Sequence, residues 1–349
     1  MNATTHLMKG PIMRRSLLAT SAVALLALSA CGGDDEPTAA GDGDGGDLTA
    51  VTLTLNWVPY GEHAPFYYGV AEGIYEEEGI DLEIRPGSGS GTTVQQVAQS
   101  QTDFGWADTP PLLNGITEGM PIKSLGVFLQ TGPASVEFFT DQGISDPADL
   151  VGKIVAGTPG DAMYATFPAW LELNGVDPDD VEVVNVDPAG KVAALVEGRA
   201  DAIMGFFHDQ GPTIEDLSGK DVDALLYSEW GMNLLGTGLV AHQNTIDDDP
   251  ELVEAFVRAT ARSWEAAAED PDAAAAAMEE GADETPPAEV LRAQLEQSIG
   301  LLRLDEAGTP GANTEEQWQE TIDLLSQNGA LEEPADPATY WESSFSEAG

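Results

Sequence analysis

The 349-residue sequence has one cysteine, four histidines, and only 13 lysines and arginines against 61 aspartates and glutamates, for a net charge of −48. A single cysteine excludes an internal disulfide and a metal cluster built on cysteines. So few basic residues argue against nucleic acid or an anionic membrane surface as a partner. No His-Glu-x-x-His or Gly-x-Ser-x-Gly motif is present. We therefore predict that the protein is not an enzyme and uses no cofactor or metal.

The amino-terminal region predicts a targeting segment. Met13-Arg14-Arg15 precedes a short apolar run over residues 16–28, and small residues lead to Cys31, the only cysteine. This order is typical of a signal peptide, and the run is too short to span a membrane. Leu-Ser-Ala-Cys31 resembles the bacterial lipobox, which implies that Cys31 becomes a lipidated first residue; an incidental thiol is the alternative. We assign residues 1–31 to the signal peptide.

Residues 32–48 are rich in glycine and aspartate and contain almost no side chain large enough to pack. This composition predicts a flexible linker. The aspartates also suggest a calcium loop, but the spacing and the closing glutamate of a calcium hand are absent. We expect the folded protein to begin after this linker.

The stretch from Val51 to Gly73 predicts the start of an α/β unit. Its first five residues are β-branched or apolar, as in a strand, and a polar and aromatic loop leads into a helical stretch. Loops that leave the carboxyl ends of strands face the ligand crevice in open α/β sheets. The candidate ligand residues of this loop are Asn56, Trp57, Tyr60 and His63. Core packing of Trp57 and a backbone-bonded His63 at the helix start are the alternatives.

A near-repeat in the order of elements predicts two similar lobes. The first copy is a helix over 68–78, a strand over 80–85, a glycine-rich loop over 86–93, a helix over 94–99 and a strand from 103. The second is a helix over 162–173, a strand over 181–186, a loop over 187–190, a helix over 191–197 and a strand over 201–204. Such alternation indicates α/β units with parallel strands. We expect the ligand to bind in a cleft between the lobes.

Beyond residue 242 the chain is acidic and helical, with helices predicted over 250–269, 270–280, 286–303 and 314–328. Apolar spacing predicts packing of these helices on the first lobe, and we assign a structural role to Trp264, Trp318 and Trp341.

Several motifs together resemble a known family. The pattern Leu55-Asn56-Trp57-x-Pro59-x-x-x-His63 is followed by Tyr67-Tyr68-Gly69, Glu72-Gly73-Ile74-Tyr75 and Glu78-Gly79-Ile80-Asp81-Leu82-Glu83-Ile84. It is similar to the periplasmic solute receptors for thiamine-type pyrimidines and alkanesulfonates, which serve ABC importers. Pyrimidine-synthesising enzymes of the same family carry a cysteine-rich iron motif, which this chain lacks.

The resemblance implies an α/β two-lobed fold of the type II periplasmic binding proteins, a clamshell with two interlobe crossings. We place the crossings near 126–137 and 236–242, so that lobe 1 comprises 49–130 and 241–349 and lobe 2 comprises 131–240. The implied function is a substrate-binding lipoprotein, outside the cytoplasm and anchored to the cell membrane through Cys31. It would deliver a solute to permease and ATPase subunits, and we expect it to be a monomer.

Further ligand loops are carried over by the same resemblance. In the first lobe the candidates are Ser88, Gly89, Ser90, Gly91, Thr92, Asp108 and Thr109, where a glycine-rich loop offers N–H groups and hydroxyls. In the second lobe they are Met163, Tyr164, Phe206, Phe207, His208 and Trp230. A plain tight turn for the glycine-rich loop and a helix N-cap for Asp108 remain open.

Asp108 would accept hydrogen bonds from ring amino groups and would repel a sulfonate, which favours a neutral or cationic ligand. Together with the resemblance, this implies a small heteroaromatic ligand similar to the thiamine pyrimidine. The alternative is an alkanesulfonate, taurine or nitrate receptor, for which Arg85 is the main basic candidate nearby. A third possibility is a secreted hydrolase or metalloenzyme using His63 and His208.

Overall fold

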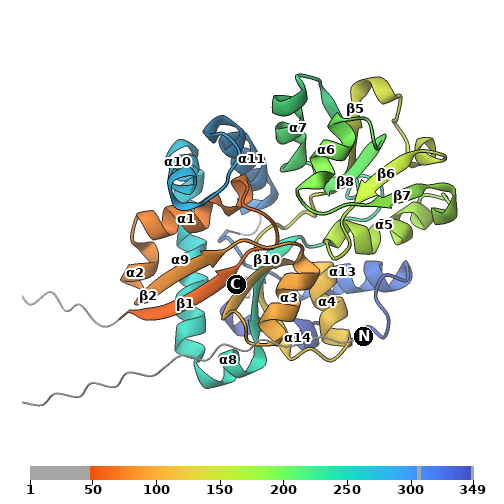
Figure 1. Cartoon of the computed structure of the whole chain (residues 1–349). Coiled ribbons are helices and arrows are strands. Elements are labelled where there is room, and N and C mark those ends of the chain that lie inside the picture. The colour runs from red at the N-terminus through yellow and green to blue at the C-terminus, as the bar shows by residue number, and fades with distance from the viewer. Residues whose placement is uncertain (1–47, 305–307, 347–349) are drawn as a thin grey trace, which may run out of the picture. The chain divides into compact units, whose positions relative to one another are not determined.

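The computed structural model describes residues 48–304 and 308–346 (Figure 1). The predicted signal peptide with its lipidation site at Cys31 lies outside the described residues, as does the linker apart from Leu48. In the part of the chain that is described, no helix combines the length and the apolar character needed to cross a membrane.

The first sheet, sheet A, has five strands in the order β2-β1-β3-β10-β4. Their bounds are β1 Thr49–Thr54, β2 Ile80–Arg85, β3 Phe104–Asp108, β4 Ile122–Val127 and β10 Thr237–His242. β1 pairs in parallel with β2 and β3, whereas β10 runs antiparallel to β3 and β4. β10, which comes late in the sequence, therefore lies between β3 and β4 and completes sheet A.

The second sheet, sheet B, repeats this arrangement in the order β7-β6-β8-β5-β9. Its strands are β5 Ala134–Phe139, β6 Ile154–Gly157, β7 Glu182–Asn185, β8 Ala202–Phe206 and β9 Val222–Leu226. β6 pairs in parallel with β7 and β8, and β5 runs antiparallel to β8 and β9. The predicted α/β class with a repeated unit is confirmed, while the exact lobe boundaries stay a prediction.

Helices connect the strands and cover the sheets (Figure 1). Those of the two repeats are α1 Ala64–Ala71, α2 Ile74–Glu77, α3 Ser90–Ala98, α4 Thr109–Thr117, α5 Ala162–Leu173, α6 Gly190–Val196 and α7 Gln210–Ser218. The predicted single helix over 68–78 is in fact split into α1 and α2, because Gly73 adopts a left-handed backbone with φ of 72°. The predicted helix over 94–99 begins four residues earlier, at Ser90, so the second half of the glycine-rich loop forms its first turn.

The helical carboxyl-terminal region is confirmed. It contains α8 Gln243–Asp248, α9 Pro250–Glu269, α10 Pro271–Gly281, α11 Ala288–Leu301, α13 Glu315–Gln327 and α14 Pro337–Tyr340. Asp249 and Asp270 cap α9 and α10 by accepting hydrogen bonds from backbone N–H groups, and Thr314 forms a capping box with Gln317 at α13. Pro250 and Pro271 occupy first-turn positions, where a missing N–H costs nothing.

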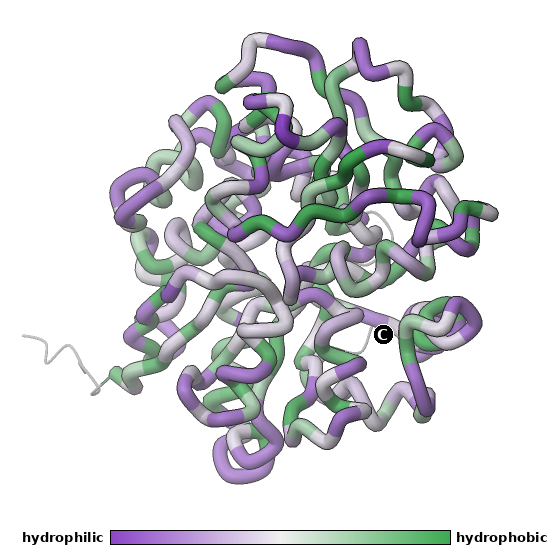
Figure 2. Tube along the Cα trace, turned by 45° about the vertical axis from the view of Figure 1, so that its right-hand side comes forward, coloured by the Kyte–Doolittle hydropathy of each residue, from purple (hydrophilic) through white to green (hydrophobic). Residues whose placement is uncertain are grey.

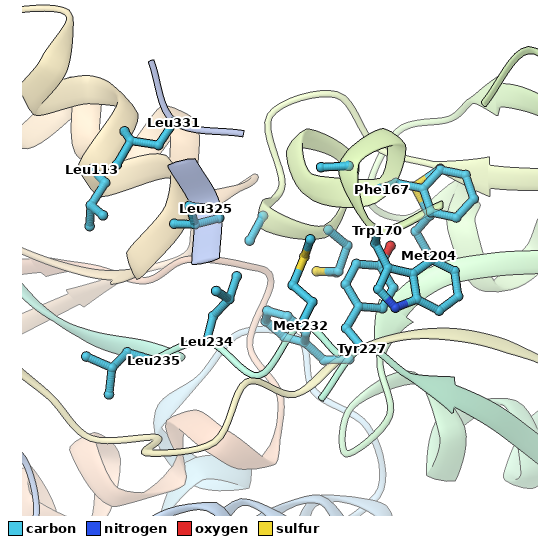
Figure 3. Packing of buried hydrophobic residues seen from close by; sticks show 14 of the residues in the cluster. Leu113, Phe167, Trp170, Met204, Tyr227, Met232, Leu234, Leu235, Leu325 and Leu331 are labelled. Atoms are coloured by element: carbon cyan, nitrogen blue, oxygen red, sulfur yellow. The ribbon is translucent and has the colours of Figure 1, made fainter. Parts of the chain in front are cut away.

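Hydrophobic residues follow the strands, and hydrophilic residues follow the outer helices (Figure 2). One core cluster includes residues of both sheets together with Leu234, Leu235 and Leu325 (Figure 3). Within it the rings of Trp170 and Tyr227 stack with centroids 4.5 Å apart. The cluster ties the two sheets to the segment before β10 and to α13.

The tryptophans assigned a structural role are buried. Trp264 stacks on Trp106 at a centroid distance of 5.8 Å, and Trp318 stacks on Trp341 at 5.9 Å. Aromatic pairs of this kind contribute about 0.5–1.5 kcal/mol beyond the area they bury. The first stack holds α9 to β3, as the apolar spacing predicted, and the second joins α13 to the residue that follows α14.

Candidate functional site

Loops at the carboxyl ends of strands from both sheets enclose a small cavity. Asn56 and Trp57 follow β1, Asp108 ends β3, and Phe206 ends β8. The complete lining is Asn56, Trp57, Ser90, Asp108, Asp161, Ala162, Met163, Lys191, Phe206, Asp209 and Gln210. Its volume of about 10 Å³ is what one water molecule needs. The structure therefore represents a closed arrangement, and a larger ligand requires the walls to separate.

The carboxyl of Asp108 is held by hydroxyl groups rather than by a helix terminus. It occupies the N-cap position of α4, but its side chain makes no capping bond. Ser90 Oγ donates to Oδ2, and Thr237 Oγ1 donates to Oδ1 at 3.0 Å. Burial raises the pKa of Asp108 to about 7, since removal from water disfavours the charged form more than the hydroxyl groups favour it.

A chain of hydrogen bonds orients Asn56 at the cavity wall. The backbone N–H of Tyr60 donates to His63 Nδ1 at 3.3 Å, so the proton of the neutral ring lies on Nε2. His63 Nε2 then donates to Asn56 Oδ1 at 2.8 Å, which leaves the amide N–H groups of Asn56 to hydrogen-bond Asp108. Burial lowers the pKa of His63 to about 4, and the ring stays neutral at pH 7. His63 therefore lies behind the wall and positions Asn56.

Lys191 places a cation against the candidate stacking ring. Its Nζ lies 4.3 Å from the centroid of the Trp57 ring and 2.9 Å from Asp161 Oδ2. Both partners of the ion pair are buried, with side-chain exposures of 1% and 4%. The cation covers part of one face of Trp57, and its charge is already balanced by Asp161.

Besides Asp108 and the ion-paired Asp161, Asp209 brings a third buried carboxyl to the cavity, from the second repeat. Gln210 Nε2 donates to its Oδ2, and Gln294 Nε2 of α11 donates to its Oδ1 at 3.1 Å. Burial raises the pKa of Asp209 to about 8, although the charge of Lys191 acts in the opposite direction. At neutral pH this carboxyl is largely protonated and can donate a hydrogen bond as well as accept one.

A fully buried cluster around Glu62 lies next to the cavity. Its carboxylate accepts hydrogen bonds from Tyr60 Oη, from Trp106 Nε1 at 2.6 Å and from His208 Nε2 at 2.7 Å. Burial favours the protonated acid, but the hydrogen bond from His208 and the other partners outweigh it, and the pKa of Glu62 lies below its ordinary value. Burial and the negative charge of Glu62 raise the pKa of Tyr60 well above its ordinary value. His208 follows β8, so this cluster links segments that carry the two sheets.

The predicted glycine-rich loop makes a close backbone contact between the two repeats. Gly91 N donates to Gly160 O at 2.9 Å. A Cβ on Gly89 would lie 2.9 Å from the same oxygen, and Gly89 has a φ of 130°, which side chains rarely adopt. Within this loop Ser90 reaches the cavity, Thr92 is half-buried and Ser88 is exposed.

Some predicted site residues lie away from the cavity. Thr109 is buried and donates to Gly236 O at 2.8 Å. The half-buried Tyr164 donates to Asn185 Oδ1 at 3.0 Å, and Trp230 packs at the edge of the core. Phe207 lines a different hollow, described below. Arg85, the basic residue expected nearest the cleft, instead pairs with Glu83 at 2.9 Å on the surface.

The structure adds Glu62, Asp161, Lys191, Asp209 and Gln210, none of which the sequence singled out. Lys191 had the clearest signal, since it is one of only 13 basic residues and opens the helix after the second-lobe loop. The acids were hidden among 61 carboxylates, so burial alone identifies them. Among the residues that the structure describes, no group of three or more histidine, cysteine, aspartate or glutamate side chains could hold a metal ion.

Solved structures identify the fold. The alkanesulfonate-binding protein SsuA from Xanthomonas axonopodis pv. citri, bound to MOPS, superimposes with a TM-score of 0.67 at 14% identity, covering 85% of this chain and 99% of that one. The two α/β sheets therefore have the type II fold of periplasmic binding proteins.

Sequence relatives refine this class. The formylaminopyrimidine-binding protein of Halalkalibacterium halodurans is 25% identical over 82% of this chain and 88% of its own length. The 4-amino-5-hydroxymethyl-2-methylpyrimidine phosphate synthase of Legionella pneumophila is 27% identical over 64% of this chain and 71% of its own. The model of the family described as NMT1/THI5 like matches residues 61–274, more than half of the chain. The chain belongs to the NMT1/THI5-like family, and its relatives include proteins named as a binding protein and as a synthase.

Proposed function

We propose that this protein is the substrate-binding receptor of an ABC importer and closes on a small heteroaromatic solute similar to an aminopyrimidine. The family and the type II fold support the receptor class. The binding-protein relative named for formylaminopyrimidine supports the ligand class. Delivery to permease and ATPase subunits, and anchoring through a lipid on Cys31, form part of the same proposal.

The observation that carries the ligand class is the pair of buried carboxyls at one aromatic cavity. Asp108 and Asp209 line the same cavity as Trp57 and Phe206. An aminopyrimidine presents amino N–H donors beside ring nitrogen acceptors. A carboxyl that is partly protonated near neutral pH can match both, since it donates through its O–H and accepts through its other oxygen. Stacking on an indole ring suits the flat faces of such a ligand.

Binding requires an opening motion. The closed cavity accommodates about one water molecule, so a ring must enter while the loops from the two sheets are apart. Closure then replaces the contacts between the walls by contacts with the ligand. The ligand stabilises the closed form only by the difference between its affinities for the two forms.

A thermal-shift screen of the purified chain tests the proposal. The panel contains aminopyrimidines, thiamine, riboflavin, alkanesulfonates, taurine and nitrate. A ligand at about 100 times its dissociation constant should add roughly 2.7 kcal/mol to the free energy of unfolding. We expect a shift with an aminopyrimidine that Trp57→Ala abolishes. A shift with sulfonates or nitrate only would refute the heteroaromatic ligand.

One observation favours the anionic alternative, namely the buried Lys191 at the cavity. An alkanesulfonate could displace Asp161 from its ammonium group. The carboxyls of Asp108 and Asp209 weigh against this ligand, because both repel an anion whenever they are ionised. Lys191→Met separates the two ligands, since it should abolish sulfonate binding and leave stacking on Trp57 available to a neutral ring.

A further inference from the structure

A second hollow lies between α7 and β9 and shares no lining residue with the cavity at Trp57, as far as the described residues show. We refer to it as the α7–β9 hollow. Its volume is about 360 Å³, within the roughly 300–1,000 Å³ of small-molecule sites. The hollow is therefore large enough for a ligand in the structure as it stands.

The lining of the α7–β9 hollow is acidic. It contains the carboxyl groups of Glu137, Glu215, Asp223 and Glu229, and the hollow has no lysine, arginine or histidine among its described lining residues. Glu215, Asp223 and Glu229 are not buried, so acidity alone could reflect the charge of the whole surface. The charge of the surface does not account for Glu137, because this acid is buried.

Glu137 is completely buried and carries an unsatisfied oxygen. Ser135 Oγ donates to its Oε1 at 3.1 Å, whereas Oε2 has no hydrogen-bond partner in the described part of the chain. Oε2 lies on the side of Gly211, 3.7 Å from where a Cβ of that residue would be, and both residues line the hollow. Leaving a buried carboxyl oxygen unpaired costs about 1–3 kcal/mol. Burial and the negative charge of Asp209 raise the pKa of Glu137 well above its ordinary value. An ammonium group in the hollow would donate to this oxygen and favour the ionised form of Glu137.

The other walls favour an organic cation over a metal ion. Val222, Ala224 and Leu226 alternate along the edge strand β9 and give one wall an apolar surface, and Phe207 adds an aromatic ring. Aromatic rings attract ammonium groups. The carboxylates are not grouped closely enough for a metal ion, as judged from the described residues. A metal would also gain nothing from an apolar wall.

We propose that the α7–β9 hollow binds a small alkyl diamine, with one ammonium group at Glu137 and the other at the more exposed carboxylates. The methylene chain between them lies against the apolar side chains of β9. Phe207, which the sequence assigned to the interlobe ligand, belongs to this second site. The proposal does not depend on which solute the cavity at Trp57 binds.

Isothermal titration of 1,4-diaminobutane into the purified full-length chain at physiological ionic strength tests the site. We expect saturable binding with one ligand per chain. Glu137→Gln keeps the shape but removes the ionisable group and should weaken binding at least ten-fold, since hydrogen bonds to charged groups contribute about 1.5–3 kcal/mol. Glu229→Gln, at a more exposed position, should weaken it about two- to five-fold and covers the case in which the buried variant misfolds.

Matched controls separate this site from counterion attraction to an acidic protein. Glu182→Gln removes an equal charge from exposed β7 and should leave the affinity unchanged. Equal losses in Glu182→Gln and Glu229→Gln, or binding that never saturates, would overturn the proposal. Loss of diamine binding in Trp57→Ala would also overturn it, because the diamine would then occupy the interlobe cavity. Stronger binding of magnesium chloride that depends on Glu137 would reassign the hollow to a metal.

Discussion

Asp108 offers a stability measurement that isolates one buried carboxyl. Replacing it by asparagine keeps the shape and removes the charge that burial disfavours. The hydroxyl groups of Ser90 and Thr237 can rotate to accept from the new amide, so the local hydrogen bonds can be retained. We therefore expect little change of stability at acid pH, where the carboxyl of the wild type is protonated too.

The effect of pH follows from the pKa of Asp108, which rises from an ordinary value of 3.8 to about 7 on folding. Between these values the folded protein holds the proton while the unfolded chain releases it. The contribution of Asp108 to the free energy of unfolding therefore falls by about 1.4 kcal/mol per pH unit and levels off above pH 7. The amide of the Asp108→Asn variant cannot ionise. From about pH 4.5 to 8, the free energy of unfolding of this variant minus that of the wild type should rise by about 3 kcal/mol.

Urea denaturation followed by tryptophan fluorescence at the two pH values measures this change. Asp81→Asn on exposed β2 is the control and should track the wild type at both values. A difference between wild type and Asp108→Asn that is the same at both pH values would show that the carboxyl is ionised in the fold, and the reasoning from burial would be wrong.

Further substitutions test the buried ion pair, two glycines and His63. Lys191→Met leaves the carboxylate of Asp161 buried without its cation and should cost about 3–5 kcal/mol, whereas adding Asp161→Asn should recover part of that loss in a denaturation experiment. Gly61→Ala drives a Cβ into the backbone oxygen of Leu291 in α11 and should cost about 1–3 kcal/mol or more; Gly300→Ala, with open space around it, should instead gain about 0.5–1 kcal/mol. Burial lowers the pKa of His63 to about 4, so between pH 6.5 and 4 the unfolded chain binds a proton that the folded protein does not. His63 therefore lowers the free energy of unfolding of the wild type by about 3 kcal/mol over that range, whereas glutamine does not titrate. The destabilisation caused by His63→Gln should shrink by the same amount in a denaturation experiment.

The arrangement of elements was predictable because it rests on local patterns. The alternation of helix and strand and the apolar spacing of the last helices both act over short stretches of sequence. The site was predictable only where a loop is short and distinctive, as at Asn56 and Trp57. Glu62 was missed although it stands in the same loop as Pro59, because nothing in its surroundings distinguishes a buried carboxylate from an exposed one in so acidic a chain.

The roles of the predicted residues changed for a related reason. His63 was considered as a ligand residue, yet its two ring nitrogens are occupied by Tyr60 and Asn56. Phe206 and Phe207 are adjacent in sequence, but only Phe206 reaches the interlobe cavity. Neighbouring residues at the end of a strand point to opposite sides, and the side that faces a cavity depends on the packing of the other repeat.

The buried charges give a reason why closure should be sensitive to what lies in the cavity. In the closed arrangement Asp108, Asp161 and Asp209 share one small cavity with a cation from Lys191. Lys191 is already paired with Asp161, so ionisation of the other two carboxyls leaves negative charge with no compensation among the lining residues described. Either bound protons or the hydrogen-bond donors of a ligand must then compensate this negative charge. A solute rich in N–H donors would thus favour closure most at the pH where Asp108 and Asp209 begin to ionise, and an anionic solute would favour it least.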